Sequence, residues 1–151
     1  PKLTFVWPVP AHIMDKHIGK AIAATAEPHR ITILTEPHTI RKQLANCCCA
    51  ITKPGTSTLE LGFLHIPMVV AFQTSWITYK LASWLCKMPW VGLPNIMLRE
   101  SRFPELLQHD CTYENILTKA QALLDGWRTN NEEYQSYITG CANLHQMFTR
   151  S

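Results

Sequence analysis

A short apolar run, Met68-Val69-Val70-Ala71-Phe72, limits most strongly what this chain can fold into. A run without polar side chains is typical of a strand in a parallel sheet that helices cover on both faces. We expect this strand to extend from Ile66 to Phe72, within an α/β domain.

Other β-rich runs precede this strand, and helical patterns separate them. The runs predict strands over residues 3–7, 30–34 and 48–52, and helices over residues 13–24, 39–45 and 55–64. Strands and helices that alternate through short connections indicate a doubly wound α/β sheet. Ligands of such sheets bind at the carboxyl ends of the strands.

The pattern changes after Ser75. Residues 75–87 predict a helix in which tryptophans alternate with lysines, and residues 89–93 predict an extended segment. The tryptophan-rich helix either covers the sheet with its aromatic side chains or lies in a membrane interface. After Pro104 we expect helices over residues 105–108, 114–124 and 132–148.

Composition excludes several classes of protein. A net charge of +3 with scattered lysines and arginines gives no reason to infer nucleic-acid binding. No apolar run reaches the roughly 18 residues that a membrane span needs. The six cysteines form no C-x-x-C pair, so we expect free thiols in a reducing cytoplasm and no metal site.

The stretch Lys53–Glu60 lies where a predicted strand turns into a helix, and it is a candidate nucleotide site. A helix N-terminus has free N–H groups and partial positive charge, which suit a phosphate. Gly55 lets the backbone approach an anion closely, and Glu60 lies within reach of ribose hydroxyls. The hydroxyl donors that follow the glycine are Thr56, Ser57 and Thr58.

A capping box is the alternative interpretation of the same residues. In that motif Ser57 accepts a hydrogen bond from the backbone N–H of Glu60, and the Glu60 carboxylate reaches back to the start of the helix. Glu60 cannot fully serve both roles. Because no Gly-Lys-Ser or Gly-Lys-Thr is present, the stretch is not a Walker loop.

Several blocks in a fixed order resemble lipid-A-disaccharide synthase, a glycosyltransferase of the GT-B fold. The similarity runs over residues 3–124, and the blocks are GTSTLE (55–60), PMVVAF (67–72), TYKLA (78–82), VGLPN (91–95), PELLQ (104–108) and TYENI (112–116). The resemblance implies a Rossmann-like doubly wound parallel sheet over residues 1–110, an incomplete GT-B C-terminal domain that binds a UDP-sugar. It implies that residues 111–151 form helices that pack toward an N-terminal domain or a partner subunit.

The resemblance also implies a reaction. The family transfers 2,3-diacylglucosamine from UDP to 2,3-diacylglucosamine 1-phosphate (lipid X) with inversion, at the cytoplasmic face of the inner membrane and without a cofactor. The catalytic acid or base belongs to the N-terminal domain, so we expect this chain to bind the donor and to be inactive alone. A non-catalytic nucleotide-sugar-binding or membrane-contact module, or another UDP-sugar GT-B enzyme, is the alternative.

The resemblance assigns roles to individual residues. Gly55 and Thr56 match the Gly-Thr pair that faces the UDP diphosphate, and Glu60 matches the carboxylate at the ribose hydroxyls. Asn95 matches an asparagine implicated in activity, although an asparagine after Pro94 in a loop is usually a turn residue. The expected UDP-sugar-binding set is Gly55, Thr56, Ser57, Thr58, Glu60, Asn95 and Arg99.

The chain departs from the family pattern at three places. Pro54 replaces a serine, and Gln73 replaces an arginine after the central strand. Met97-Leu98-Arg99 replaces Ala-Gly-Arg, so either Arg99 or Arg102 supplies the cation.

The last helix carries an expectation about assembly. The family can exchange C-terminal elements between subunits, which allows a homodimer. We expect the helix over residues 132–148 to expose an apolar stripe if it finds no partner within this chain. The stripe consists of Tyr134, Tyr137, Ile138, Leu144 and Met147.

Overall fold

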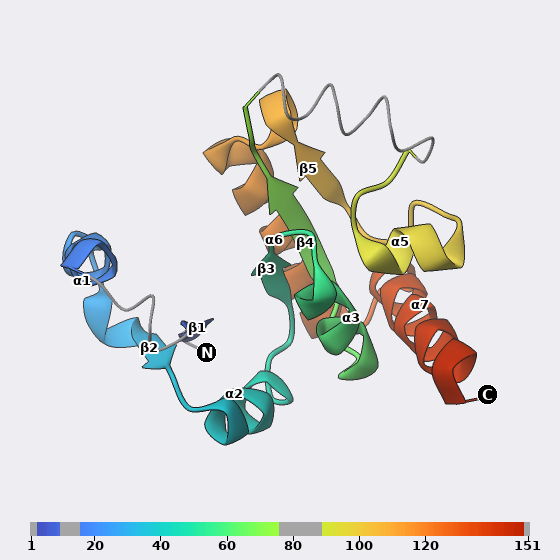
Figure 1. The fold of residues 1–151 in the computed structure, drawn as a ribbon, viewed down its shortest axis with the longest axis horizontal. Helices are drawn as coiled ribbons and strands as arrows, with labels where there is room; N and C mark the ends of the chain where they lie inside the picture. Colours follow the sequence, from blue (N-terminus) through green and yellow to red (C-terminus); the bar gives the residue numbers. More distant parts are fainter. Residues whose placement is uncertain (1–2, 10–15, 76–88, 150–151) are drawn as a thin grey trace. The chain divides into compact units, whose positions relative to one another are not determined.

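The computed structural model describes residues 3–9, 16–75 and 89–149, and the tryptophan-rich helix predicted after Ser75 lies outside them. The chain forms two compact units, residues 1–46 and residues 47–151. Both units are built on parallel strands with helices between them, so the predicted α/β class is confirmed (Figure 1). The division into domains at residue 110 stays a prediction.

The first unit contains a two-stranded parallel sheet in which Phe5 lies opposite Ile31. Its core is small: Val9 and Leu34 are buried, and the Val9 N–H donates a hydrogen bond of 2.9 Å to the Leu34 carbonyl. The elements in chain order are β1 (Phe5–Pro8), α1 (Lys16–Ala23), the short helix η2 (Pro28–Arg30), β2 (Ile31–Leu34) and α2 (Pro37–Leu44).

The second unit contains a three-stranded parallel sheet with β4 in the centre. Ile51 of β3 lies opposite Val69, and Val70 lies opposite Glu105 of β5. The elements in chain order are β3 (Ala50–Thr52), α3 (Thr56–Phe63), β4 (Met68–Phe72), α5 (Leu93–Leu98), β5 (Glu105–Leu107), η3 (Gln108–Asp110), α6 (Tyr113–Thr129) and α7 (Glu132–Thr149).

Strand β4 is covered on both faces, as its apolar sequence predicts. Val69 packs with Leu106 and with Leu123 of α6. Successive side chains of a strand point to opposite faces, and the Val70 side chain lies instead beside Gly92, just before α5. Figure 1 shows α6 behind the sheet and α3 in front of it, and both helices contact β3 and β4.

The helix predicted after Pro104 is wrong, and the helix that precedes Pro104 was not predicted. Residues 105–107 form strand β5 rather than a helix, because the backbone continues the ladder of β4: the Val70 N–H donates to the Pro104 carbonyl, and Leu106 is buried. Helix α5 begins at Leu93, where an extended segment was expected to end. Pro94 is compatible with this start because the first turn of a helix tolerates a proline.

The apolar stripe of α7 finds partners within its own unit. Tyr134 and Leu144 are buried, so the condition under which their exposure was expected, the lack of a partner within the chain, is not met, whereas Met147 is 48% exposed. Helix α7 packs against α3, α5 and α6. Its approach to α3 is close, since a Cβ atom on Gly62 would lie 3.0 Å from Leu144 Cδ1.

Helix α6 presents large apolar side chains to solvent instead. Tyr113 is 74% exposed, Leu117 40% and Trp127 47%. These positions fall on one side of a helix with 3.6 residues per turn, and we call this side the α6 face. None of the helices within residues 16–75 and 89–149 has the length and apolar character that a bilayer-spanning segment needs.

No disulfide joins the cysteines of the described segments, which are Cys47, Cys48, Cys49, Cys111 and Cys141. Burial raises the pKa of the Cys49 and Cys141 thiols to about 12, which keeps both thiols protonated and unreactive at neutral pH. In these segments no group of three or more His, Cys, Asp or Glu side chains is arranged to hold a metal ion.

Candidate functional site

The turn between β3 and α3 has a backbone conformation that only glycine adopts readily. Gly55 has φ 146° and ψ −170°, a region that L-residues avoid because of their Cβ atom. A Cβ atom built on Gly55 would meet no atom of the described residues within 4 Å, so among them open space lies in front of Gly55. The turn follows the carboxyl end of β3, where parallel sheets bind their ligands.

The first turn of α3 leaves backbone donors available. The Thr58 N–H donates to the Gly55 carbonyl over 3.1 Å, and the N–H groups of Thr56 and Ser57 precede this bond. Such groups have no acceptor within their helix. Together with the positive end of the helix dipole they make the turn suitable for an anion.

The hydroxyls of this turn differ in their surroundings. Thr58 is fully buried, and its Oγ1 donates a hydrogen bond of 2.6 Å to the Gly55 carbonyl, so this side chain fixes the turn from inside. Thr56 and Ser57 are exposed. The Ser57 hydroxyl lies 3.2 Å from the Thr52 hydroxyl at the end of β3.

The predicted capping box is not formed. The residue that precedes α3 is Gly55, and no side chain caps the helix. Ser57 lies inside the helix as its second residue, so it cannot be the cap of the motif. Glu60 is exposed, and its side chain makes no hydrogen bond or ion pair with any residue that the structure describes, which leaves the carboxylate available one turn after the glycine.

Asn95 is a buried member of α5 rather than a turn residue, and it is only 1% exposed. Its Oδ1 accepts from the N–H groups of Arg102 (3.0 Å) and Phe103 (2.9 Å). Its Nδ2 donates to the Phe103 carbonyl and to Glu105 Oε1, each over 2.8 Å. Both donors and both lone pairs of the amide are therefore engaged.

Glu105 connects the start of β5 to the start of α5. Oε2 accepts from the Val91 N–H over 2.8 Å, and Oε1 accepts from the Gly92 N–H over 3.0 Å. A Cβ atom on Gly92 would lie 2.9 Å from Oε1, so glycine is needed for this approach. Glu105 was not among the predicted site residues, although the PELLQ block that contains it was recognised.

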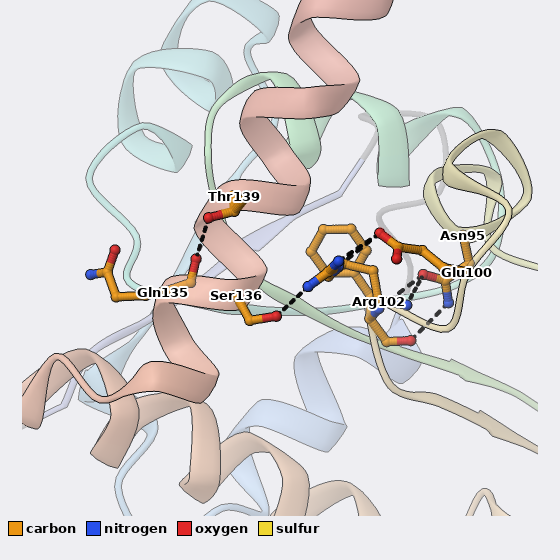
Figure 2. A network of polar contacts seen from close by, with 7 residues as sticks. Asn95, Glu100, Arg102, Gln135, Ser136 and Thr139 are labelled. Carbon is orange, nitrogen blue, oxygen red and sulfur yellow. Dashed lines mark hydrogen bonds and ion pairs between the residues drawn. The ribbon is translucent and has the colours of Figure 1, made fainter.

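The two arginines after α5 have different partners. Arg102 donates to Glu100 through Nε (2.9 Å) and Nη2 (2.8 Å), and also to the hydroxyl of Ser136 on α7 (Figure 2). Arg99 is exposed and makes no side-chain hydrogen bond or ion pair with the rest of the described chain. Its φ of 55° is left-handed, the conformation that favours glycine.

The side-chain amide of Gln108 connects the segments that follow β4 and β5. The Thr74 N–H donates to Gln108 Oε1 over 2.8 Å, and Gln108 Nε2 donates to the Thr74 carbonyl over 3.1 Å. Gln73, which replaces the arginine of the family pattern, is exposed at this end of the sheet.

The predicted residues thus fall into two groups within the second unit. The Gly55 turn holds Gly55, Thr56, Ser57, Thr58 and Glu60, and the α5 segment holds Asn95 and Arg99. Helices α3 and α5 pack against each other, so both groups belong to one packed structure.

Comparison with known proteins identifies the family of the chain. Residues 2–150 match the family model described as Lipid-A-disaccharide synthetase. A lipid-A-disaccharide synthase of Albidiferax ferrireducens is 32% identical over 149 residues, which are 99% of this chain and 36% of that protein. One of Verminephrobacter eiseniae is 33% identical over 151 residues, 100% of this chain and 38% of that protein.

A shorter match is more similar in sequence. A lipid-A-disaccharide synthase of Anaeromyxobacter dehalogenans is 43% identical over 75 residues, 50% of this chain and 20% of that protein. The chain spans little more than a third of the length of the relatives that it matches from end to end. On these matches, the chain belongs to the lipid-A-disaccharide synthetase family.

Proposed function

We propose that this chain is the donor-binding part of an inverting glycosyltransferase that makes lipid A disaccharide. It binds UDP-2,3-diacylglucosamine, and the sugar is transferred to lipid X with release of UDP. The observation that carries the proposal is the open Gly55 turn at the carboxyl end of β3, with free N–H groups at the start of α3. The relatives' names support the reaction.

Each residue of the two groups has a role in this proposal. The N–H groups and hydroxyls of Thr56 and Ser57 bind the diphosphate, while Thr58 holds the turn from inside. Glu60 accepts hydrogen bonds from the ribose hydroxyls, and the Arg99 guanidinium binds a phosphate. Pro54 offers no N–H to the ligand.

Titration of UDP into the chain, followed by calorimetry, tests the binding role. Glu60→Ala is expected to weaken binding about tenfold, roughly 1.4 kcal/mol, because charged acceptors of hydrogen bonds are lost. Glu114→Ala is the matched control, since Glu114 is also an exposed helical glutamate but lies on α6. Equal affinities for wild type and Glu60→Ala would remove the ribose role of Glu60.

The chemistry itself requires a general base on the acceptor hydroxyl. We expect this base in a domain that the chain does not contain. The chain mixed with the donor and lipid X should therefore form no disaccharide detectable by mass spectrometry, although it binds UDP. Turnover by the chain alone would contradict this division of labour.

The same proposal places the protein at the inner-membrane surface, because both substrates carry acyl chains. Co-sedimentation with vesicles of phosphatidylethanolamine and phosphatidylglycerol tests this location. Binding to these vesicles without any affinity for UDP would favour the alternative of a non-catalytic membrane-contact module.

A homodimer through the C-terminal helices is a further part of the proposal. Since α7 buries Tyr134 and Leu144 of its stripe, we assign the contact with a second copy to the exposed α6 face. Light scattering should show a dimer that Leu117→Glu dissociates, whereas Lys119→Glu, an exposed position on the same helix, should leave it intact. A monomeric wild type would exclude this assembly.

A further inference from the structure

We propose that the Lys53 ammonium binds the donor diphosphate at the Gly55 turn and supplies a full positive charge that the backbone there lacks. The inference rests on the proposed function, because it adds a residue to the same site. Lys53 is not in the set of site residues that the resemblance implies. Its role is argued from its position, its freedom from other partners and the charge that a diphosphate needs.

The first argument is the position of Lys53 in the fold. Strand β3 ends at Thr52, and Lys53 is the next residue, two before Gly55. The Thr52 hydroxyl lies 3.2 Å from the Ser57 hydroxyl, and it also donates to the Lys53 carbonyl over 3.2 Å. Since consecutive Cα atoms are about 3.8 Å apart, these contacts place the Lys53 backbone close to the first turn of α3.

The second argument is that the Lys53 side chain is free. It is exposed, and its ammonium makes no hydrogen bond or ion pair within residues 3–9, 16–75 and 89–149. Arg30, Arg102 and Arg128, in contrast, each bind a carboxylate. Because the Lys53 ammonium sits on a flexible four-carbon stem, it can turn toward the start of α3 without a change in the backbone.

The third argument concerns the charge at the turn. The start of a helix carries about half a positive charge, whereas a diphosphate carries more than one negative charge. The exposed Glu60 carboxylate, one turn later, opposes an anion by like-charge repulsion. Lys53 is the only lysine or arginine between residues 43 and 79 of the sequence. It is therefore the cation that β3, α3 and β4 offer to a phosphate.

The proposed reaction makes use of such a cation. Transfer of the sugar breaks the bond between its anomeric carbon and the diphosphate, and the electron pair stays on the departing UDP. The acceptor oxygen forms the new bond to that carbon and gives its proton to the general base. The negative charge on the diphosphate rises during this step, and a cation beside it stabilises the leaving group. Lys53 should consequently interact more strongly with UDP than with an intact UDP-sugar.

Calorimetric titration of the chain tests the inference, with UDP, UDP-N-acetylglucosamine and uridine as probes. Lys53→Gln should weaken UDP binding about tenfold and UDP-N-acetylglucosamine binding about threefold, and it should leave uridine binding unchanged. Lys53→Arg keeps the charge and should retain most of the affinity. Lys119→Gln is the matched control, since Lys119 is also an exposed lysine but lies on α6.

Ionic strength supplies a readout that a merely structural role would not change. Salt screens the attraction between exposed charges, so the wild-type affinity for UDP should fall between about 50 mM and about 500 mM NaCl. The affinity of Lys53→Gln should fall less over the same range. Equal salt dependence in the two proteins would overturn the inference.

The remaining outcomes separate this inference from the proposed function. If Lys53→Gln binds UDP as tightly as wild type, or loses affinity for uridine by the same factor as for UDP, the inference fails while the proposed function stands. If the wild-type chain does not bind UDP, both fail together. The losses from Lys53→Gln and Glu60→Ala should add, because the two residues bind different parts of the nucleotide. A Lys53→Gln effect that vanishes beside Glu60→Ala would show that Lys53 acts through Glu60 instead.

Discussion

The Gly55 turn and the segment of residues 95–105 are both polar segments of the second unit, yet they use their hydrogen-bonding groups in opposite ways. The turn leaves the N–H groups of Thr56 and Ser57 and the Glu60 carboxylate available beside open space. The Asn95 amide is buried and satisfied within the protein. Free capacity for hydrogen bonds therefore separates the two segments.

The largest expected effect concerns Asn95, whose side-chain amide has all its hydrogen-bond partners within the protein. Asn95→Leu should lower the free energy of unfolding by about 3 kcal/mol or more, because it leaves buried groups of Arg102, Phe103 and Glu105 without partners. Urea denaturation measures the loss. Ser57→Ala, at the exposed turn, should cost less than about 1 kcal/mol. Equal losses would remove the contrast between the two segments.

Gly55→Ala tests the conformation of the open turn. The substitution should destabilise the fold by about 1–3 kcal/mol through its backbone alone, since the added methyl meets no atom of the described residues. It should also weaken UDP binding. Gly19→Ala is the matched control: Gly19 also has open space but lies within α1, so the change should stabilise by about 0.5–1 kcal/mol. If thermal unfolding showed that both substitutions stabilise the chain, or that both destabilise it, the backbone argument would be wrong.

Thr58→Val tests whether the turn is held from inside. Loss of the hydrogen bond from Oγ1 to the Gly55 carbonyl should cost about 1 kcal/mol, with little change in shape. Thr58→Ser keeps the hydroxyl and should retain UDP affinity better than Thr58→Val does. The opposite ranking in calorimetry would argue that the methyl group matters more than the hydrogen bond.

The smallest expected effect lies at the other end of α3. His65 has a left-handed φ of 57°, and the N–H groups of His65 and Ile66 donate to the carbonyls of Gly62 and Leu61. This is the Schellman arrangement, in which glycine is preferred. His65→Gly should therefore stabilise the chain by about 0.5–1 kcal/mol without changing UDP affinity. Destabilisation would show that the ring contact with His145 contributes more to stability than glycine gains at the left-handed φ.

The Gly55 turn could be predicted from the sequence better than the hydrogen bonds of Asn95, for a physical reason. A strand, a glycine and the start of a helix are local features, so β3, Gly55 and α3 could be recognised from adjacent residues. The Asn95 bonds reach Arg102, Phe103 and Glu105 across a turn, and only the folded chain defines them. For the same reason β5 was mistaken for a helix: its conformation follows from pairing with β4.

Gly140 has a consequence for how α7 tolerates change. The aliphatic part of Arg102 crosses α7 where the helix lacks a side chain, so the helix is held in one longitudinal register. A single-residue deletion between Asn131 and Gly140 would rotate a side chain into that notch and move Leu144 away from Gly62. Removal of the exposed residues after Leu144 would leave the register intact. The number of residues in α7 before Gly140 is therefore fixed, whereas the helix can be shortened after Leu144.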